Sequence, residues 1–179
     1  YTLTEKNIKV TIFEKEKDSL SHGTGRNSGV IHSGIYYQPN TLRSNLCIKG
    51  AKLMKKFIID NNLYINNCGK LLLPKTKNDI ETLKLLYERS KEVGVEAQKL
   101  NSIEEIIRIE PNCNPLYNDA LFIKDTAIAD PKEVSNKLIE ILKKRNVIIK
   151  YGSKVDEISS ENTSITTKGN INKFDFIIN

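Results

Sequence analysis

Residues 21–37 constrain the fold of this chain more than any other segment. The seventeen-residue run SHGTGRNSGVIHSGIYY contains four glycines and both histidines of the 179-residue chain. Glycine lets backbone N–H groups approach a ligand closely, and Thr24, Asn27 and Ser28 add side-chain hydrogen-bonding groups. The composition is therefore typical of a loop that lies against an anionic or polar cofactor, with a flexible Gly/Ser turn as the alternative.

A short β-strand is expected just before this loop. Residues 8–13, IKVTIF, are β-branched and apolar, and Glu14 follows them directly. In dinucleotide-binding folds the second strand of the βαβ unit ends in a carboxylate that binds the ribose hydroxyls of adenosine. Glu14 occupies that place, and an ordinary surface charge is the alternative. The glycine-rich fingerprint that should precede it is not in this chain, so residues 1–7 are expected to be the end of the preceding helix and its turn.

The overall composition limits the classes of function. The chain is 39% hydrophobic and 28% charged, and its net charge of +6 comes from lysines scattered among acidic residues rather than gathered in a run. We therefore expect no nucleic-acid partner. No apolar run approaches the roughly 20 residues that span a bilayer, and no signal peptide is visible, so a cytoplasmic location is expected. The odd number and wide spacing of Cys47, Cys68 and Cys113 indicate neither a disulfide framework nor a metal site.

Four helices are expected from periodicity and capping. Apolar residues recur at helical spacing over residues 41–62, which predicts an amphipathic helix whose apolar set is Leu42, Leu46, Leu53, Met54, Phe57 and Ile58. The other three helices are predicted by their capping residues: residues 76–94 with Thr76 and Asp79 as a capping box and Gly94 as C-cap, residues 102–110 with Ser102 and Glu105 as a second box, and residues 130–145 with Asp130 as N-cap and Pro131 behind it.

Short apolar runs predict strands on both sides of the last helix. The earlier ones are residues 71–73, 95–100 and 120–124, and the later ones are 147–149, 154–158, 164–167 and 173–178. The last run is cut off inside an apolar stretch that is typical of a buried strand. We therefore expect the chain to be a fragment of a longer protein.

Several segments together resemble the FAD-dependent L-2-hydroxyglutarate dehydrogenase/oxidase family, which belongs to a wider group with the glycerol-3-phosphate dehydrogenases and D-amino acid oxidases. The resemblance covers nearly the whole chain in colinear order. Its segments are EKE at residues 14–16, TGRNSGVIHSGIYY at 24–37, LCIKGAKLMKKF at 46–57, CGKLLL at 68–73, LYERSKEVGVE at 86–96, IEP at 109–111 and TAIADP at 126–131. The SGVIHSGIYY and CGKL segments are the most specific to this branch.

The resemblance implies an α/β fold, with α+β character in an inserted lobe. Residues 1–62 and 130–179 would form two parts of a Rossmann-like FAD-binding domain, and residues 63–129 would form a lobe of the substrate domain. The strand after the last helix would return to a parallel sheet. Since the glycine-rich contacts with FAD lie outside the chain, we expect this fragment alone to bind flavin weakly or not at all.

The resemblance also implies roles for particular residues. The cofactor would be held by Glu14, Lys15, Thr24, Gly25, Asn27, Ser28, Gly29 and Val155. The parent enzyme would oxidise a 2-hydroxy acid to the 2-oxo acid by hydride transfer to flavin. His32 is the candidate base for the hydroxyl proton, since imidazole exchanges protons near neutral pH. The alternative is that His32 hydrogen-bonds the cofactor or holds the loop.

A dicarboxylate substrate requires cations and hydrogen-bond donors, and Arg26, Tyr37 and Lys70 are the candidates nearest the specific motifs. The alternatives are a surface lysine at position 70 and a core-packing tyrosine at position 37. An electron acceptor and peripheral membrane association are further expectations for the parent. The alternative functions are an FAD-dependent glycerol-3-phosphate dehydrogenase and a basic binding module without a cofactor.

Overall fold

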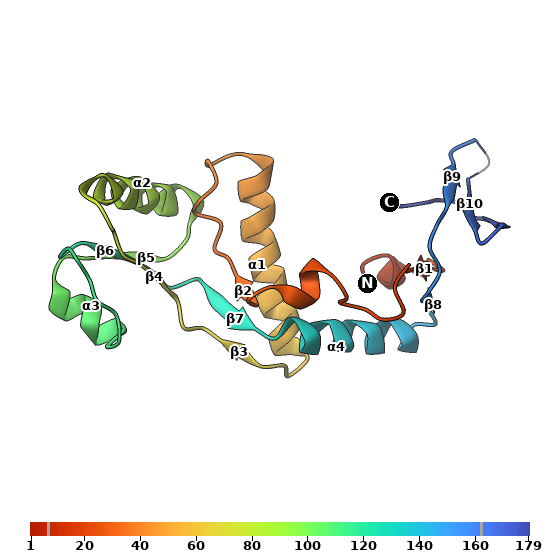
Figure 1. Cartoon of the computed structure of the whole chain (residues 1–179), viewed down its shortest axis with the longest axis horizontal. Helices are drawn as coiled ribbons and strands as arrows, with labels where there is room; N and C mark the ends of the chain where they lie inside the picture. The colour runs from red at the N-terminus through yellow and green to blue at the C-terminus, as the bar shows by residue number, and fades with distance from the viewer. Residues whose placement is uncertain (7, 162) are drawn as a thin grey trace. The chain divides into compact units, whose positions relative to one another are not determined.

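The computed structural model describes residues 1–6, 8–161 and 163–179, and these form two compact units (Figure 1). Unit 1 comprises Tyr1–Asn27 and Pro131–Asn179, and unit 2 comprises Ser28–Asp130. The chain therefore leaves unit 1 inside the glycine-rich run and returns to it at the last helix. The functional division at residues 62/63 and 129/130 stays a prediction.

A parallel strand pair organises unit 1. β1 (Thr11–Phe13) pairs with β8 (Ile148–Lys150), with Ile12 opposite Ile149. The helix α4 (Pro131–Lys144) leads into β8, and its side chains Val134 and Leu142 are buried. This confirms that the chain returns from the last helix to a parallel strand.

Unit 1 also contains two short 3₁₀ helices, η1 (Thr4–Lys6) and η2 (Gly23–Arg26), and an antiparallel sheet. The strand order in that sheet is β11 (Asn170–Lys173), β10 (Ser164–Thr167) and β9 (Glu157–Ser159). Ile165 on the central strand is buried. A strand is expected at residues 154–158, whereas the observed strand β9 begins three residues later and ends one residue later.

The prediction of a strand at residues 173–178 is wrong. Lys168 and Gly169 adopt positive φ angles of 48° and 79°, which folds the chain back so that Lys173 already pairs with Ser164, the first residue of β10. The apolar run beyond Lys173 therefore lies past the end of the register. No strand includes residues 174–179, and Phe176 and Ile178 are 87% and 79% exposed.

The long helix of unit 2 is α1 (Leu42–Asp60), and the side chain of its N-cap Thr41 accepts the Ser44 N–H. The helix was predicted correctly, but only part of its expected apolar face is buried. Leu42, Leu46 and Leu53 are 74%, 59% and 57% exposed, whereas Ile58 and Ser44 are fully buried. The face of α1 that packs in this structure is therefore set by its neighbours and not by the leucine spacing.

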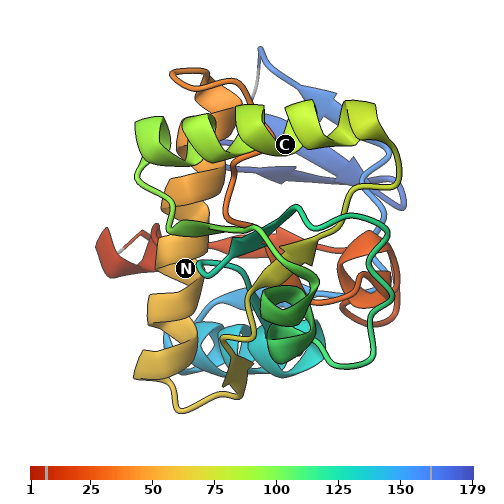
Figure 2. The same cartoon turned by 90° about the vertical axis from the view of Figure 1, so that its left-hand side faces the viewer.

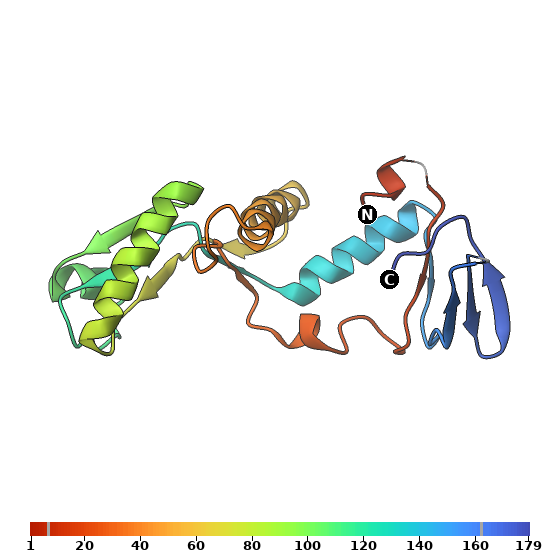
Figure 3. The ribbon, with the colours of Figure 1, turned by 90° about the horizontal axis from the view of Figure 1, so that it is seen from above.

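The main sheet of unit 2 is covered on both faces (Figure 3). Its antiparallel order is β4 (Lys70–Leu72), β6 (Ala120–Ile123) and β5 (Ala97–Leu100). Because successive strand residues point to opposite faces, alternate residues of β6 join different core clusters. Leu121 and Ile123 pack with Leu86 of α2 (Lys77–Val93), and Ala120 packs with Ile106 of α3 (Ile103–Ile109).

A second small sheet in unit 2 was not predicted. β7 (Ala127–Ala129) pairs antiparallel with both β2 (Val30–Ile31) and β3 (Ile65–Asn66). Strands this short have no recognisable alternation, so only their partners define them. Figure 2 shows unit 2 with α1 and α2 running crosswise. Within the described ranges, no helix has the length and apolar character that crossing a membrane requires.

Candidate functional site

Glu14 lies directly after β1 in unit 1, where the sequence predicts a ribose-binding carboxylate. Its backbone N–H donates to the Lys150 carbonyl at 3.0 Å, and its carbonyl accepts the Ser153 N–H at 2.8 Å. Its side-chain Oε1 accepts the Glu16 N–H at 2.8 Å. Its Oε2 has no partner among the described residues, so one carboxylate oxygen remains available to a hydroxyl donor. Lys15 is exposed beside it.

The glycine-rich run begins in unit 1 as a tightly packed turn around η2. A Cβ on Gly25 would overlap the Leu20 carbonyl oxygen, so only glycine fits there, whereas a Cβ on Gly23 would meet no described atom within 4 Å. The Asn27 side-chain Nδ2 donates to the Thr24 carbonyl at 2.7 Å. This donor, predicted for the cofactor, therefore supports the loop itself in this structure.

The remaining candidates of unit 1 lie on either side of these features. Arg26 ends η2 and is exposed, and Val155 is half-buried between β8 and β9. His22 hydrogen-bonds Glu16, with 2.9 Å between Nε2 and Oε1. This contact ties the start of the glycine-rich run to the residues that follow Glu14.

The candidates of unit 2 begin at Ser28, which is exposed, and Gly29, whose φ is 69° and whose carbonyl accepts the Ala129 N–H at 3.0 Å. His32 follows β2 directly. Its side chain is exposed, and the imidazole has no hydrogen-bond partner in the described part of the chain. The next residues, Ser33 and Ile35, are buried, so the backbone behind His32 is anchored in the unit.

Cys47 on α1 contributes to that anchoring. Its Sγ donates to the His32 carbonyl oxygen at 3.7 Å. Burial raises the pKa of the Cys47 thiol. The thiol therefore stays protonated near neutral pH, which suits a weak structural donor rather than a nucleophile.

The two tyrosines after His32, Tyr36 and Tyr37, each make a cation–aromatic contact. The Lys70 Nζ lies 4.8 Å from the centroid of the Tyr36 ring, and the Arg43 Cζ lies 5.4 Å from the centroid of the Tyr37 ring. Arg89 of α2 donates from Nη1 to the Tyr36 carbonyl at 3.2 Å. Arg89 was not predicted, because it is 53 residues away in sequence and in an ordinary helical context.

The predicted site residues thus divide between the two units. Unit 1 brings together the predicted cofactor residues at the end of β1 and in η2, and unit 2 brings Tyr37 and Lys70 into cation–aromatic contacts beside Tyr36. The described residues contain no group of three or more His, Cys, Asp and Glu side chains that could hold a metal ion. Among the described candidate residues, a ligand could contact the Glu14 Oε2, the glycine backbone of η2, the His32 imidazole and the cationic side chains.

A family described as FAD dependent oxidoreductase matches residues 1–179 of this chain. The mitochondrial L-2-hydroxyglutarate dehydrogenase of Dictyostelium discoideum is 43% identical over 129 residues, which are 72% of this chain and 29% of that protein. The mitochondrial L-2-hydroxyglutarate dehydrogenase of Homo sapiens is 33% identical over 169 residues, covering 93% of this chain and 36% of that protein. The chain therefore spans about a third of the length of the curated relatives that it matches.

Solved structures share the fold at lower sequence identity. A glycine oxidase from Geobacillus kaustophilus matches with a TM-score of 0.79 and 17% identity, covering 94% of this chain and 47% of that chain. An FAD-bound L-alpha-glycerophosphate oxidase from Mycoplasma pneumoniae matches with a TM-score of 0.77 and 24% identity, covering 98% and 48%. These likenesses concern the fold alone.

Proposed function

Since this chain belongs to the FAD-dependent oxidoreductase family, we propose that the protein that carries it oxidises a 2-hydroxy acid of the L-2-hydroxyglutarate type to the 2-oxo acid. The observation that carries the proposal is the 33% to 43% identity with relatives named L-2-hydroxyglutarate dehydrogenase over most of this chain. Because the chain spans about a third of those relatives, the activity is proposed for the whole protein.

The residues of unit 1 fit part of an FAD site. The Glu14 Oε2 has no partner among the described residues and could accept a ribose hydroxyl, and Gly25 permits a close backbone turn in η2. Lys15, Thr24, Asn27 and Val155 would contribute further contacts in this unit, and Ser28 and Gly29 would do so from unit 2. When bound, FAD supplies the hydride acceptor for the oxidation.

His32 is the proposed base. Oxidation of a secondary alcohol removes a hydride from carbon and a proton from the hydroxyl, leaving a carbonyl group. An exposed imidazole that has no hydrogen-bond partner among the described residues can accept that proton, and imidazole is the side chain suited to proton exchange near neutral pH. The anchored backbone at Ser33 and Ile35 would hold it in place.

Cationic and phenolic groups are proposed to bind the substrate. Lys70 offers an ammonium group, and Tyr37 offers the hydroxyl of the ring over which the Arg43 guanidinium lies. Arg26 is an exposed cation in unit 1. Carboxylates are bound most strongly by such charged donors.

The location and electron acceptor of the enzyme are also proposals. The three cysteines are free thiols, which is consistent with a reducing compartment such as the cytoplasm. We propose a cytoplasmic enzyme that passes electrons to a separate acceptor and contacts a membrane peripherally. Sedimentation of the whole protein with lipid vesicles tests the last point.

The test is an absorbance spectrum of the whole protein, purified without added flavin, between roughly 350 and 500 nm, where the bound cofactor absorbs. We expect flavin bands that L-2-hydroxyglutarate bleaches in the absence of oxygen. Glycerol 3-phosphate is the control substrate, because the likeness to the glycerophosphate oxidase concerns the fold alone. A colourless protein that FAD cannot reconstitute contradicts the proposal, and bleaching by glycerol 3-phosphate alone would change the substrate.

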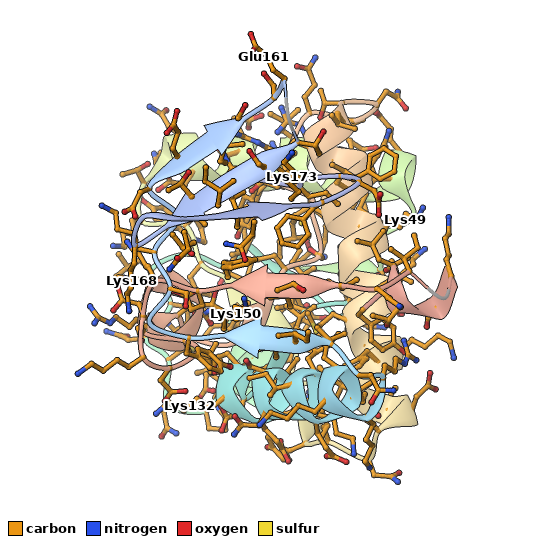
Figure 4. The ribbon with its side chains drawn as sticks, turned by 90° about the vertical axis from the view of Figure 1, so that its right-hand side faces the viewer. Lys49, Lys132, Lys150, Glu161, Lys168 and Lys173 are labelled. Atoms are coloured by element: carbon orange, nitrogen blue, oxygen red, sulfur yellow. The ribbon has the colours of Figure 1, made fainter. Side chains whose placement is uncertain are left out.

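A basic binding module without a cofactor is not supported. Figure 4 shows Lys132, Lys150, Lys168 and Lys173 spread over unit 1 rather than gathered into one patch. Lys137 and Lys144 are both paired with Glu140. Scattered and paired lysines are typical of a solvated surface and not of a nucleic-acid interface.

A further inference from the structure

Three elements of unit 2 meet at Tyr36. The residue precedes α1, Lys70 is the first residue of β4, and Arg89 lies on α2. The Lys70 Nζ is 4.8 Å from the Tyr36 ring centroid, and the Arg89 Nη1 is 3.2 Å from the Tyr36 carbonyl oxygen. We call Tyr36, Lys70 and Arg89 the Tyr36 site.

The Tyr36 site is built on the larger hydrophobic cluster of unit 2. Ile35, immediately before Tyr36, is fully buried in that cluster with Leu86 and Ile123. Lys70 pairs in register with Ile123, and Leu86 precedes Arg89 on α2 by less than one helical turn. The two cations are therefore fixed at the edge of a packed core, and both are half-buried.

The charges of the Tyr36 site are not neutralised within the described residues. Lysines elsewhere hold carboxylates, such as Lys84 with Glu81 at 2.7 Å and Lys144 with Glu140 at 2.6 Å. Neither Lys70 nor Arg89 has an ion pair among the described residues. Arg89 uses one N–H in its hydrogen bond to Tyr36. Within the described part of the chain, the Lys70 ammonium group contacts only the Tyr36 ring.

These groups are suited to a carboxylate. A guanidinium and an ammonium group donate charge-assisted hydrogen bonds to carboxylate oxygens, and the planar guanidinium fits them geometrically. The phenolic hydroxyl of Tyr36, which is 43% exposed, can add a neutral donor. An apolar group in the same place would gain none of these bonds.

We propose that the Tyr36 site binds the second carboxylate of a dicarboxylate substrate, the one remote from the hydroxyl group. The inference rests on the proposed function and deepens it, because it assigns the choice of dicarboxylic over monocarboxylic acids to Lys70 and Arg89. The sequence indicates Lys70 as a substrate-binding cation without saying which carboxylate it binds. The structure adds Tyr36 and Arg89 to the same site.

The test is calorimetric titration of the 179-residue chain with L-2-hydroxyglutarate and with L-2-hydroxypentanoate, which carries a methyl group in place of the second carboxylate. We expect the dicarboxylate to bind at least about tenfold more tightly, which is typical of hydrogen bonds to a charged group. Lys70→Gln and Arg89→Gln should each remove most of this preference, because each removes a charged donor to the second carboxylate. Arg89→Lys, which keeps the charge but not the planar fork, should have an intermediate effect.

Lys77→Gln is the matched control, because Lys77 is an exposed cation on the same helix as Arg89. Circular dichroism verifies that every variant is folded. The inference is overturned if the two acids bind equally or if the folded chain does not bind the dicarboxylate. It is also overturned if Lys77→Gln loses as much of the preference for the dicarboxylate as Lys70→Gln and Arg89→Gln do.

Failure of this inference is distinguishable from failure of the proposed function. If L-2-hydroxyglutarate bleaches the flavin of the whole protein but Lys70→Gln and Arg89→Gln keep the preference, only the inference fails. If the preference depends on both residues but no bleaching occurs, the dicarboxylate site stands and the proposed oxidation fails.

Discussion

At the scale of single residues, the candidate site depends on a few polar groups that have no hydrogen-bond partner among the described residues. The Glu14 Oε1 accepts a hydrogen bond within its own turn, whereas its Oε2 has no partner in the described ranges. His32 projects from a backbone anchored by Ser33 and Ile35. Such free groups can bind a ligand without first breaking a protein contact. His22, in contrast, is already hydrogen-bonded to Glu16.

This contrast makes the two histidines a matched pair for mutation. In the whole protein, His32→Asn is expected to lower kcat with L-2-hydroxyglutarate by about 10²- to 10⁴-fold, the usual contribution of a general base. The flavin spectrum should be unchanged, because the proposed role concerns the hydroxyl proton. His22→Asn should leave kcat near the wild-type value. Anaerobic stopped-flow measurement of flavin bleaching gives both rates, and equal rates in the two variants would exclude His32 as the base.

The two glycines of η2 provide a second residue-scale test. Gly25→Ala places a Cβ that overlaps the Leu20 carbonyl oxygen and should lower the free energy of unfolding. A loss of about 1–3 kcal/mol is typical of such overpacking. Gly23→Ala meets no atom within 4 Å and should cost much less. Urea unfolding of both variants measures the difference, and equal losses would contradict the close contact at Gly25.

At the scale of elements, helix ends are fixed by local hydrogen bonds. The N-terminus of α2 has a full capping box, in which Thr76 Oγ1 accepts the Asp79 N–H and Asp79 accepts the Thr76 N–H. At the N-terminus of α3 the Ser102 side chain accepts the Glu105 N–H, but the Glu105 carboxylate accepts the N–H of Asn101 instead of that of Ser102. Both helices begin where the sequence predicts.

The α2 capping box makes stability depend on pH. Hydrogen bonds from the backbone N–H groups of Thr76 and Lys75 lower the pKa of the Asp79 carboxyl. A group whose pKa is lower in the folded state stabilises the protein above its unfolded pKa, about 3.9 for Asp, and loses that effect as the pH falls through the folded value. Asp79→Asn should therefore be less stable than wild type at pH 7.

Urea unfolding of wild type and Asp79→Asn between pH 7 and pH 2 tests this pH dependence. The difference between their unfolding free energies should be constant well above the unfolded pKa of Asp and should shrink below it. A difference that does not change with pH would mean that the Asp79 charge does not stabilise the cap.

The packing of α1 gives a further element-scale prediction. Ile58 is fully buried, so Ile58→Ala should lower the free energy of unfolding by about 2–5 kcal/mol. Leu46 is 59% exposed, so Leu46→Ala should change the unfolding free energy of this chain by only about 0.5 kcal/mol. Thermal or urea unfolding compares the two variants. A large loss in Leu46→Ala would mean that the leucine face of α1 is buried in solution.

At the scale of the whole molecule, the chain consists of two compact units. Unit 2 is continuous in sequence, and its two sheets and two main hydrophobic clusters lie entirely within it. Unit 1 is discontinuous in sequence, because its strands β1 and β8 pair although all residues of unit 2 lie between them along the chain. The two units therefore differ in how far they depend on the rest of the chain.

We expect residues 28–130 expressed alone to fold. All strands of the two sheets of unit 2 find their partners within this range, so excision leaves none of these strand pairings broken. Thermal unfolding followed by circular dichroism should show one cooperative transition. A broad, non-cooperative transition would indicate that unit 2 needs contacts from outside residues 28–130.

The sequence by itself determined the features that depend on local interactions. The helices α2 and α3 begin directly after the predicted N-cap residues Thr76 and Ser102, because a cap is a hydrogen bond between residues a few positions apart. The helix α4 begins at Pro131, as predicted. The strand before Glu14 and the family membership also follow from short, contiguous motifs. The assignment of His32, Arg26, Tyr37 and Lys70 to chemistry stays a prediction.

Tertiary structure decided what depends on distant partners. β2 and β3 are strands only because β7, some sixty to one hundred positions later, pairs with both. The apolar run after Lys173 forms no strand because β10 ends its register at Ser164, and the leucines of α1 are exposed because other residues of that helix meet the core. Arg89 meets Tyr36 only when α2 packs on the sheet. Such contacts depend on the closure of long loops, which no local pattern encodes.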